Sequence, residues 1–190
     1  EIPKELLLNL LKAFMMDLGK TRYKTFDEIL FYCTHSANPV GRLILILHSK
    51  TENNTFEYSD SICTALQITN FMQDISLDIL KDRIYFPLDD FEKYNYSEMD
   101  FMNKKANPAF EFILNHQIER TEDLYAHGSN LIKRLKGKLK FEIILTLSGG
   151  KQILKKVKQY NTSLFFNRPK LNLYDKISIL IRSIVKWILT

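Results

Sequence analysis

The stretch Gln67-Ile-Thr-Asn70-Phe-Met-Gln-Asp74-Ile-Ser-Leu-Asp78 places a row of polar side chains in an otherwise apolar part of the chain. At about 100° per residue, the four numbered side chains fall within roughly 80° of one another on a helix. No charged residue occurs from Ser61 to Gln73. A helix that is apolar nearly all round is normally buried, and carboxylates on a buried helix need compensation. We infer that metal ions facing an internal cavity provide this compensation.

The composition favours a single helical domain. The 190 residues are enough for one substantial core, and 45% hydrophobic with 26% charged residues is ordinary for a globular protein. Only six Gly and five Pro interrupt long runs that are rich in Leu and Ile. We find no strand pair, internal repeat or low-complexity segment. The sequence therefore predicts an all-α fold, a bundle of long helices around a central cavity.

Apolar spacing and turn signals divide the chain into helices. Because proline removes a backbone donor, we expect a break at Ala37-Asn38-Pro39. Ser59 is the expected N-cap of the helix that carries the polar row. Residues 82–95 are expected to form a loop with a short extended piece. The predicted helices cover residues 4–18, 25–49, 59–80, 107–135, 141–166 and 170–189.

Cysteine use and charge restrict the partners. Cys33 and Cys63 are isolated in sequence, which indicates reduced, buried thiols and a cytoplasmic protein. No apolar run reaches the ~18 residues of a membrane span. Nine Lys or Arg and a single acid, Asp175, occur in residues 151–190. This charge fits either a solvated basic face or an anionic membrane surface. No nucleic-acid-binding motif accompanies it, which argues against nucleic acid as a partner.

Two roles are open for the last predicted helix, residues 170–189. Its apolar residues recur at helical spacing, and Lys176, Arg182 and Lys186 lie elsewhere on its circumference. Such a helix either closes the bundle as part of the core or lies in the surface of a membrane. The second role implies peripheral association with the inner face of the cytoplasmic membrane.

The acids of the polar row have the spacing of a metal site. Asp74 and Asp78 are one helical turn apart, so their side chains project side by side, and Asn70 adds an amide oxygen one turn earlier. Oxygen ligands suit Mg²⁺, which is usually held by one or two carboxylates and the phosphates of a substrate. We predict a clamp for a metal and a diphosphate, beside an apolar cavity that holds a carbocation. The alternative is that both acids are surface groups paired with Lys81 and Arg83.

Arg83 and Tyr85 follow the polar row closely. The forked donors of an arginine grip phosphate well, and the tyrosine has a hydroxyl that reaches into a cavity. Arg83 is also placed to neutralise the C-terminal end of a helix. Spacing alone does not decide between these two roles for Arg83.

Short motifs with a distinctive spacing extend over most of the chain. They are Tyr32-Cys33, Ala37-Asn-Pro-Val-Gly41, Leu66-Gln-x-x-Asn70-x-x-x-Asp74-x-x-x-Asp78, Arg83-Ile-Tyr85-Phe-Pro87, Gly149-Gly150 and Arg168-Pro169-Lys170-Leu171. Together they resemble the squalene/phytoene synthase family, which joins prenyl diphosphates head to head. The particular residues found within these motifs look most like those of the bacterial hopanoid-pathway branch, hydroxysqualene synthase. That branch ionises presqualene diphosphate and quenches the cation with water.

The resemblance implies an isoprenoid synthase-like bundle that converts farnesyl or presqualene diphosphate to squalene or hydroxysqualene, with Mg²⁺ as cofactor. The metal ligands that it implies are Asn70, Asp74 and Asp78. The catalytic residues that it implies are Asp74, Asp78 and Tyr32. The substrate-binding residues that it implies are Gln67, Asn70, Arg83, Tyr85 and His35. It also implies other hopanoid-pathway enzymes as partners.

The chain departs from the family pattern before its long motif. The family's first aspartate-rich motif has no counterpart, because Asp17, Asp27 and Glu28 do not form a pair one turn apart. Gln73 also stands where many members carry Arg. We expect residues 1–190 to be the C-terminal portion of one such domain, truncated at the N-terminus and with little activity alone. The alternatives are a non-catalytic relative that serves as a binding or assembly module, and a structural bundle whose acids are incidental.

Overall fold

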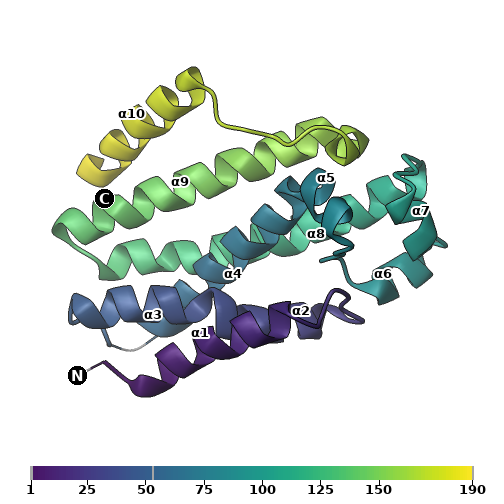
Figure 1. The fold of residues 1–190 in the computed structure, drawn as a ribbon. Helices are drawn as coiled ribbons and strands as arrows, with labels where there is room; N and C mark the ends of the chain where they lie inside the picture. The colour runs from purple at the N-terminus through teal and green to yellow at the C-terminus, as the bar shows by residue number, and fades with distance from the viewer. Residues whose placement is uncertain (1, 53, 190) are drawn as a thin grey trace.

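The computed structural model describes residues 2–52 and 54–189 (Figure 1). Within these ranges the backbone forms helices and no strand, apart from one isolated parallel bridge between Tyr23 and Pro87. The all-α prediction is confirmed. The α-helices are α1 (Lys4–Asp17), α2 (Phe26–Ser36), α3 (Asn38–Leu47), α4 (Thr55–Gln73), α5 (Ile75–Asp78), α6 (Leu88–Lys93), α7 (Glu98–Met102), α8 (Pro108–Gly128), α9 (Gly137–Tyr160) and α10 (Leu173–Leu189). Short 3-10 helices are η1 (Ile79–Lys81), η2 (Ser129–Arg134) and η3 (Asn161–Phe165).

Helix α4 is the central element of the bundle. It packs against α3, α8 and α9, and Figure 1 shows it running through the middle of the molecule. Its buried side chains point in several directions around the helix axis, because neighbours surround it. They include Ile62, Ala65, Ile68, Phe71 and Met72. The expectation that this helix is buried is therefore confirmed, except for the sector that carries Gln67 and Asn70, which are half-buried and exposed.

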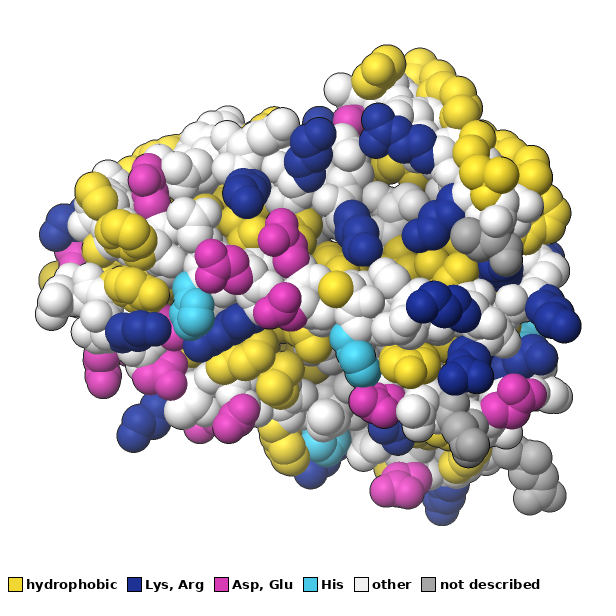
Figure 2. All heavy atoms as spheres, turned by 180° about the vertical axis from the view of Figure 1, so that it is seen from behind, with side chains coloured by type: hydrophobic (Ala, Val, Ile, Leu, Met, Phe, Trp, Pro, Cys, Tyr) yellow, Lys and Arg dark blue, Asp and Glu magenta, His cyan; other side chains and the backbone are white. Residues whose placement is uncertain are grey.

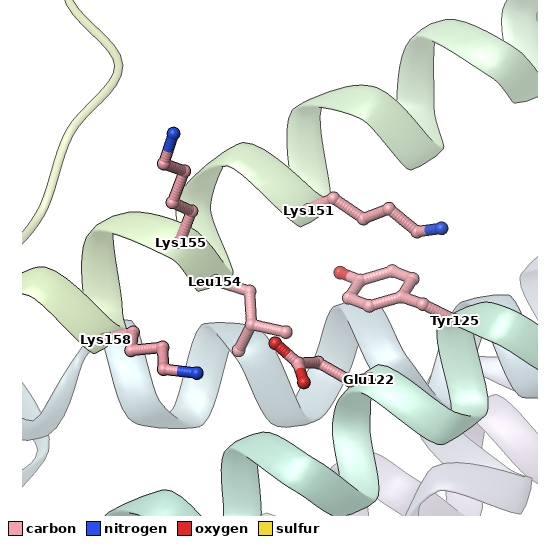
Figure 3. Close-up of a pocket in the computed structure, with 6 residues that line it drawn as sticks. All are labelled: Glu122, Tyr125, Lys151, Leu154, Lys155 and Lys158. Carbon is pink, nitrogen blue, oxygen red and sulfur yellow. The ribbon is translucent and has the colours of Figure 1, made fainter.

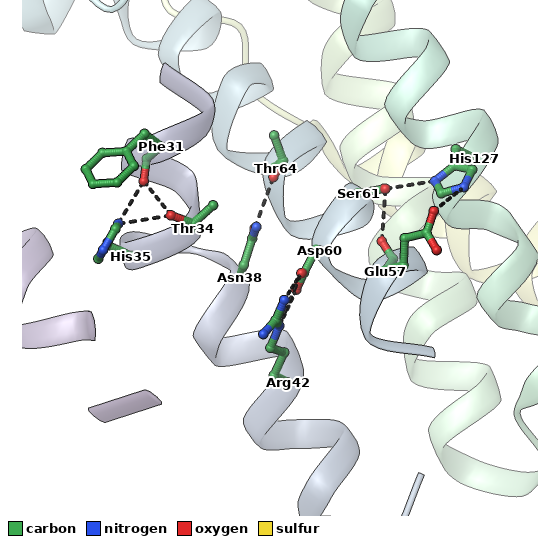
Figure 4. A network of polar contacts seen from close by, with 10 residues as sticks. All are labelled: Phe31, Thr34, His35, Asn38, Arg42, Glu57, Asp60, Ser61, Thr64 and His127. Carbon is green, nitrogen blue, oxygen red and sulfur yellow. Dashed lines mark hydrogen bonds and ion pairs between the residues drawn. The ribbon is translucent and has the colours of Figure 1, made fainter. Parts of the chain in front are cut away.

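Polar contacts fix the position of α4 against its neighbours (Figure 4). The Arg42 guanidinium of α3 donates to Asp60, with Nε 2.9 Å from Oδ1 and Nη2 2.5 Å from Oδ2. The Thr64 hydroxyl donates to Asn38 Oδ1 over 3.0 Å in the buried interface. A Cβ added to Gly41 would lie 2.4 Å from the Ser59 hydroxyl oxygen, so only glycine lets α3 approach α4 this closely.

The boundaries of α4 differ from the prediction at both ends. The helix begins at Thr55, and Ser59 is buried inside it, so the predicted N-cap is wrong. Asn54 precedes the helix with a left-handed φ of 60°, a conformation that asparagine tolerates. At the other end the regular helix stops at Gln73. Asp74 breaks it with φ −99° and ψ 10° before α5 begins.

Other boundaries follow the sequence with local corrections. The predicted break at Ala37 separates α2 from α3. The predicted loop over residues 82–95 contains the short helix α6, which buries Phe91. The predicted helices 107–135 and 141–166 each end in a 3-10 turn, and the second begins earlier, at Gly137. Both cysteines are free, with Cys33 buried and Cys63 half-buried.

Two helices at opposite edges of the bundle expose apolar side chains. Helix α1 packs on α2 and α3, whereas α10 packs on α9. Figure 1 shows α1 below the bundle and α10 above it. The exposed apolar residues of α1 are Leu7, Leu8, Leu11, Phe14 and Met15. No helix in the described part of the chain combines the length and the hydrophobicity that crossing a bilayer requires.

Candidate active site

The predicted metal ligands lie where α4 gives way to α5. Asn70 is exposed, and Asp74 and Asp78 are half-buried. Although Asp74 breaks the regular helix, the Asp78 amide donates to the Asp74 carbonyl over 2.9 Å. This helical hydrogen bond preserves the one-turn spacing, so the three oxygen-bearing side chains remain in a row. We call Asn70, Asp74 and Asp78 the polar ridge.

The cation that pairs with the polar ridge comes from far along the chain. Arg168 donates from Nε to Asp74 Oδ1, and its Nη2 lies 3.3 Å from Oδ2. Neither Lys81 nor Arg83 forms an ion pair with Asp74 or Asp78 in the part of the chain that the structure describes. The alternative that these two cations simply neutralise the acids is therefore not what the structure shows.

Asp78 has an unusual electrostatic setting. Burial, followed by the nearby Asp74 carboxylate, raises the pKa of Asp78 to about 6, although Lys81, Arg83 and Arg168 act in the opposite direction. A raised pKa means that the ionised form of this carboxyl is held at a cost in free energy. A bound divalent cation would offset that cost.

The segment of residues 166–172, between η3 and α10, contacts the end of α4. Besides the Arg168 contact, the Gln73 side-chain amide donates to the Pro169 carbonyl over 2.6 Å. Sequence reasoning noted Arg168-Pro169 as a family motif but gave Arg168 no role in the site. The ion pair joins residues 94 positions apart, and no local periodicity reports such a contact.

Aromatic rings form a wall next to the polar ridge. Tyr85 stacks on Phe71 of α4 with a centroid distance of 3.9 Å. The Tyr32 ring lies 6.0 Å from Phe71 and 6.2 Å from Tyr85. The structure therefore brings the predicted residues Tyr32 and Tyr85 together with α4, and Arg83 Nη1 lies 3.5 Å from the Tyr85 hydroxyl.

Asp17, at the end of α1, belongs to the same cluster. The Tyr32 hydroxyl donates to Asp17 Oδ2 over 3.2 Å, and Arg83 Nη2 donates to the Asp17 carbonyl over 3.0 Å. Asp17 Oδ1 is buried without a hydrogen-bond partner. Burial, and then the charge of Asp17, raise the pKa of Tyr32, so this hydroxyl stays protonated at neutral pH. Sequence reasoning set Asp17 aside because it has no acid one turn away.

An apolar pocket opens along the face of α4 that leads to the polar ridge. It has a volume of about 200 Å³, and its walls come from α3, α4, α9 and Leu131. The α4 residues that line it are Ser59, Ile62, Cys63 and Leu66. At about 100° per residue these positions share one sector of roughly 120° with Asn70 and Asp74. From Leu66 to Asp74 the helix rises about 12 Å. One face of α4 thus passes from an apolar hollow to a polar end.

The donor set suits a metal that shares its coordination with a ligand. Two carboxylates and one amide oxygen are hard donors of the kind that Mg²⁺ prefers. Among residues 2–52 and 54–189, no group of three or more His, Cys, Asp or Glu residues is arranged to hold a metal by itself. The residues present therefore fit Mg²⁺ only where substrate oxygens complete its coordination, which is the usual case for this ion.

The remaining predicted site residues have different settings. Gln67 is half-buried on α4. His35 is buried on α2, where its Nδ1 lies 2.8 Å from the Phe31 carbonyl oxygen and 3.0 Å from the Thr34 hydroxyl (Figure 4). These contacts keep His35 within its own helix, and they do not link it to the polar ridge. Its role in substrate binding stays a prediction.

A second pocket, between α8 and α9, was not predicted (Figure 3). It measures about 270 Å³ and is lined by Glu122, Tyr125, Lys151, Leu154, Lys155 and Lys158. None of the predicted site residues borders it. The Lys151 ammonium donates to the Ser129 hydroxyl over 3.2 Å, and burial lowers the pKa of Lys151. This pocket is basic and open, unlike the apolar pocket beside α4.

Comparison with known proteins places these features in context. A family model described as squalene/phytoene synthase matches residues 1–175. A hydroxysqualene synthase from Rhodopseudomonas palustris is 36% identical over 136 residues, which cover 71% of this chain and 46% of that protein. A hydroxysqualene synthase from Sinorhizobium fredii is 33% identical over 159 residues, 83% of this chain and 54% of the relative. The chain thus spans about half the length of these curated relatives.

Solved structures support the same architecture. The squalene synthase HpnC from Alicyclobacillus acidocaldarius superposes with a TM-score of 0.81 at 31% sequence identity, covering 84% of this chain and 60% of that one. A dehydrosqualene synthase crystallised with a ligand superposes with a TM-score of 0.90 over 100% of this chain and 67% of its own. Its identity is 18%, so it supports the fold alone.

Proposed function

The chain belongs to the squalene/phytoene synthase family, and on that premise we propose that it binds a prenyl diphosphate together with Mg²⁺ for ionisation. The substrate is farnesyl or presqualene diphosphate. Loss of diphosphate from presqualene diphosphate, followed by addition of water and loss of a proton, gives hydroxysqualene, whereas squalene as the product requires a hydride donor as co-substrate. The similarity to hydroxysqualene synthases favours the hopanoid branch. One observation carries the proposal. A single face of α4 joins an apolar pocket to the polar ridge, as a ligand with a hydrocarbon tail and an anionic head requires.

The residues of the polar ridge have distinct roles in this proposal. Asn70, Asp74 and Asp78 are the residues that would hold Mg²⁺. The metal, when bound, neutralises charge that develops on the departing diphosphate. Ionisation of Asp78 is costly in the free protein, because burial and Asp74 raise its pKa. Binding of a cation therefore relieves an existing repulsion.

Arg168 exchanges partners in the proposed complex. In the free protein its guanidinium is paired with Asp74. A metal held by Asp74 would compete for the same carboxylate, and Arg168 would then be available to donate to a phosphate oxygen, which an arginine fork binds well. Arg83 and Lys81, which lower the pKa of Asp78 from nearby, add positive charge on the same side. Together these groups favour a multiply charged anion.

The aromatic wall serves the carbon end of the reaction. Phe71 follows Asn70 on α4, and its ring stacks on that of Tyr85 with the centroids 3.9 Å apart. Aromatic faces attract cations, so this wall stabilises the carbocation that ionisation leaves behind. Tyr32 stays protonated and its hydroxyl donates a hydrogen bond to Asp17, which orients the ring.

Ligand binding tests the proposal without requiring turnover. We would titrate the 190-residue chain with farnesyl thiodiphosphate, which resists ionisation, by calorimetry with Mg²⁺ or with EDTA. We expect binding that needs Mg²⁺ and that weakens about 100-fold in Asp78→Asn, since a metal ligand is lost. Asp123→Asn, which changes an exposed acid on α8, is the matched control and should bind like the wild type. Binding that ignores both Mg²⁺ and Asp78 would overturn the proposal.

A second candidate function is a non-catalytic binding or assembly module of the same family. The pairing of Asp74 with Arg168 favours it, because an acid neutralised by the protein itself needs no metal. The same titration separates the two functions. A module of this kind would show no Mg²⁺-dependent affinity for the thiodiphosphate, and Asp78→Asn would leave its ligand binding unchanged.

A further inference from the structure

Helix α10 is amphipathic, but it turns its apolar side away from the protein. Its buried residues are Asp175, Ile179 and Ser183, so most of the contact stripe is polar. The exposed apolar residues, which we call the outer face of α10, follow helical spacing along its whole length. They are Leu173, Tyr174, Ile177, Leu180, Ile181, Ile184, Val185, Ile188 and Leu189. The Trp187 ring instead packs against Phe141 of α9. The expectation that this helix closes the bundle with an apolar core face is therefore wrong.

Polar contacts fix this outward orientation. Lys156 of α9 pairs with Asp175 over 2.8 Å, and the Gln152 side-chain amide donates to Asp175 over 2.9 Å. Further along, the Ser183 hydroxyl donates to the Ser148 hydroxyl over 3.3 Å. Rotating the helix to bury its apolar side would break these bonds and leave buried polar groups unpaired, which is costly. The sequence thus specifies the exposure of the outer face.

The charges around the outer face are almost all positive. Asp175 is the single acid in residues 151–190, and its ion pair with Lys156 is buried. Lys176 and Arg182 are exposed on α10, and Lys170 is exposed just before it. In Figure 2, the rear view, yellow side chains gather along the upper right edge where α10 lies, and dark blue side chains lie beside them. The surface is apolar with a basic border.

This pattern selects a membrane over a protein partner. An apolar stripe with Lys and Arg on its flanks is typical of helices that lie in the interface of an anionic bilayer. Tyr174 is exposed near the start of α10, and such a ring favours the boundary between water and lipid. A second copy of the chain packed on this face would bring the cations of two α10 helices close together, and like charges across an interface are unfavourable.

We propose that the outer face of α10 docks the protein on anionic lipid bilayers. The helix lies in the plane of the membrane, with its apolar side chains among the acyl chains and its cations at the headgroups. The bundle stays on the aqueous side, because α9 covers the opposite face of α10. This inference does not depend on the proposed ligand or its metal.

Vesicle flotation tests the docking surface. The full chain would be mixed with vesicles of phosphatidylcholine alone or with 30% phosphatidylglycerol, at low and high salt. We expect the protein to bind the anionic vesicles more strongly than the neutral ones. High salt should weaken this binding. The double variant Ile181→Glu/Ile188→Glu changes side chains that are 56% and 70% exposed. It should lose about tenfold or more of the vesicle affinity with an unchanged circular dichroism spectrum.

The control variant changes two apolar residues at the opposite edge of the molecule. Leu11→Glu/Phe14→Glu alters side chains of α1 that are 57% and 66% exposed, and it should keep the vesicle affinity of the wild type. Equal loss in both variants, or no binding to anionic vesicles, would overturn the proposal. Sedimentation of a dimer that only the α10 variant abolishes would also overturn it, because a second copy would then cover the outer face. Thiodiphosphate titration in parallel distinguishes this failure from failure of the proposed function.

Discussion

Helices α4 and α10 both combine polar and apolar stripes, but they bury opposite sides. Helix α4 has neighbours on several sides and directs its polar ridge along the face that holds the apolar pocket. Helix α10 has one main neighbour, α9, and buries a stripe that includes Asp175 and Ser183. Periodicity shows which residues share a face, but only the neighbouring helix determines which face is inside. This difference separates a ligand-binding helix from a surface-docking one.

Arg168 lies between the two helices in sequence. Its substitution should cause the largest change in ligand affinity among the following variants. Because Arg168 is paired with Asp74, Arg168→Ala should lower the concentration of Mg²⁺ needed for half-maximal binding of pyrophosphate. At saturating Mg²⁺ the same variant should bind pyrophosphate about tenfold more weakly, since a charge-assisted hydrogen bond is lost. Calorimetry measures both affinities. If both affinities change in the same direction, Arg168 does not exchange partners.

A substitution of Tyr32 tests whether its hydrogen bond to the buried Asp17 stabilises the protein near α4. Tyr32→Phe removes the hydroxyl that donates to Asp17 Oδ2, which leaves a second carboxylate oxygen without a donor. We expect the free energy of unfolding to fall by about 1.5 kcal/mol or more, as for other hydrogen bonds to charged groups. Urea denaturation measures this value, and Tyr174→Phe, at an exposed tyrosine of α10, is a control. An unchanged midpoint would mean that water replaces the lost hydroxyl.

Asp175 tests the polar docking of α10. Asp175→Asn removes the charge that pairs with Lys156 and should lower Tm by roughly 2–4 °C. It should also make α10 the first segment that a protease cuts, because the helix detaches before the bundle unfolds. Limited proteolysis followed by mass spectrometry identifies the site of cleavage. Cleavage elsewhere with α10 intact would show that its apolar contacts, rather than Asp175, hold it in place.

Asp78 near α4 and Asp175 on α10 should have opposite and smaller effects on how stability depends on pH. The pKa of Asp78 is raised by burial to about 6, so its contribution to stability decreases as the pH rises from about 4 to 6. The pKa of Asp175 is lowered, chiefly by Lys156, so its contribution is present above its unfolded pKa and lost as the pH falls. Asp78→Asn should therefore raise the Tm at pH 7 relative to the Tm at pH 4. Asp175→Asn should flatten the acid side of the profile, and the same slope in both variants would contradict these assignments.

The fold class and the polar ridge follow from local sequence, whereas the partners of the ridge do not. Spacing identified the helix through Asp74 and the break at Ala37, because both depend on neighbours within one or two turns. It missed Arg168 and Asp17, which reach the site only through tertiary packing. It also placed the start of α4 at Ser59, since a serine that fits against Gly41 has the same residue type as a cap. The inverted orientation of α10 depends on Lys156 of the preceding helix.

The central claim is that one ligand spans the apolar pocket and the polar ridge. The direct measurement compares pyrophosphate with thiodiphosphates of increasing prenyl length, at saturating Mg²⁺, in the wild type and in Ile44→Trp. Ile44 lines the pocket and is 38% exposed, so the larger ring can fill the pocket without a buried clash. We predict that each prenyl unit tightens binding in the wild type by about tenfold or more until the pocket is full. In Ile44→Trp this gain should vanish while pyrophosphate binds as before. Equal affinities for pyrophosphate and the prenyl compounds in the wild type would contradict the account.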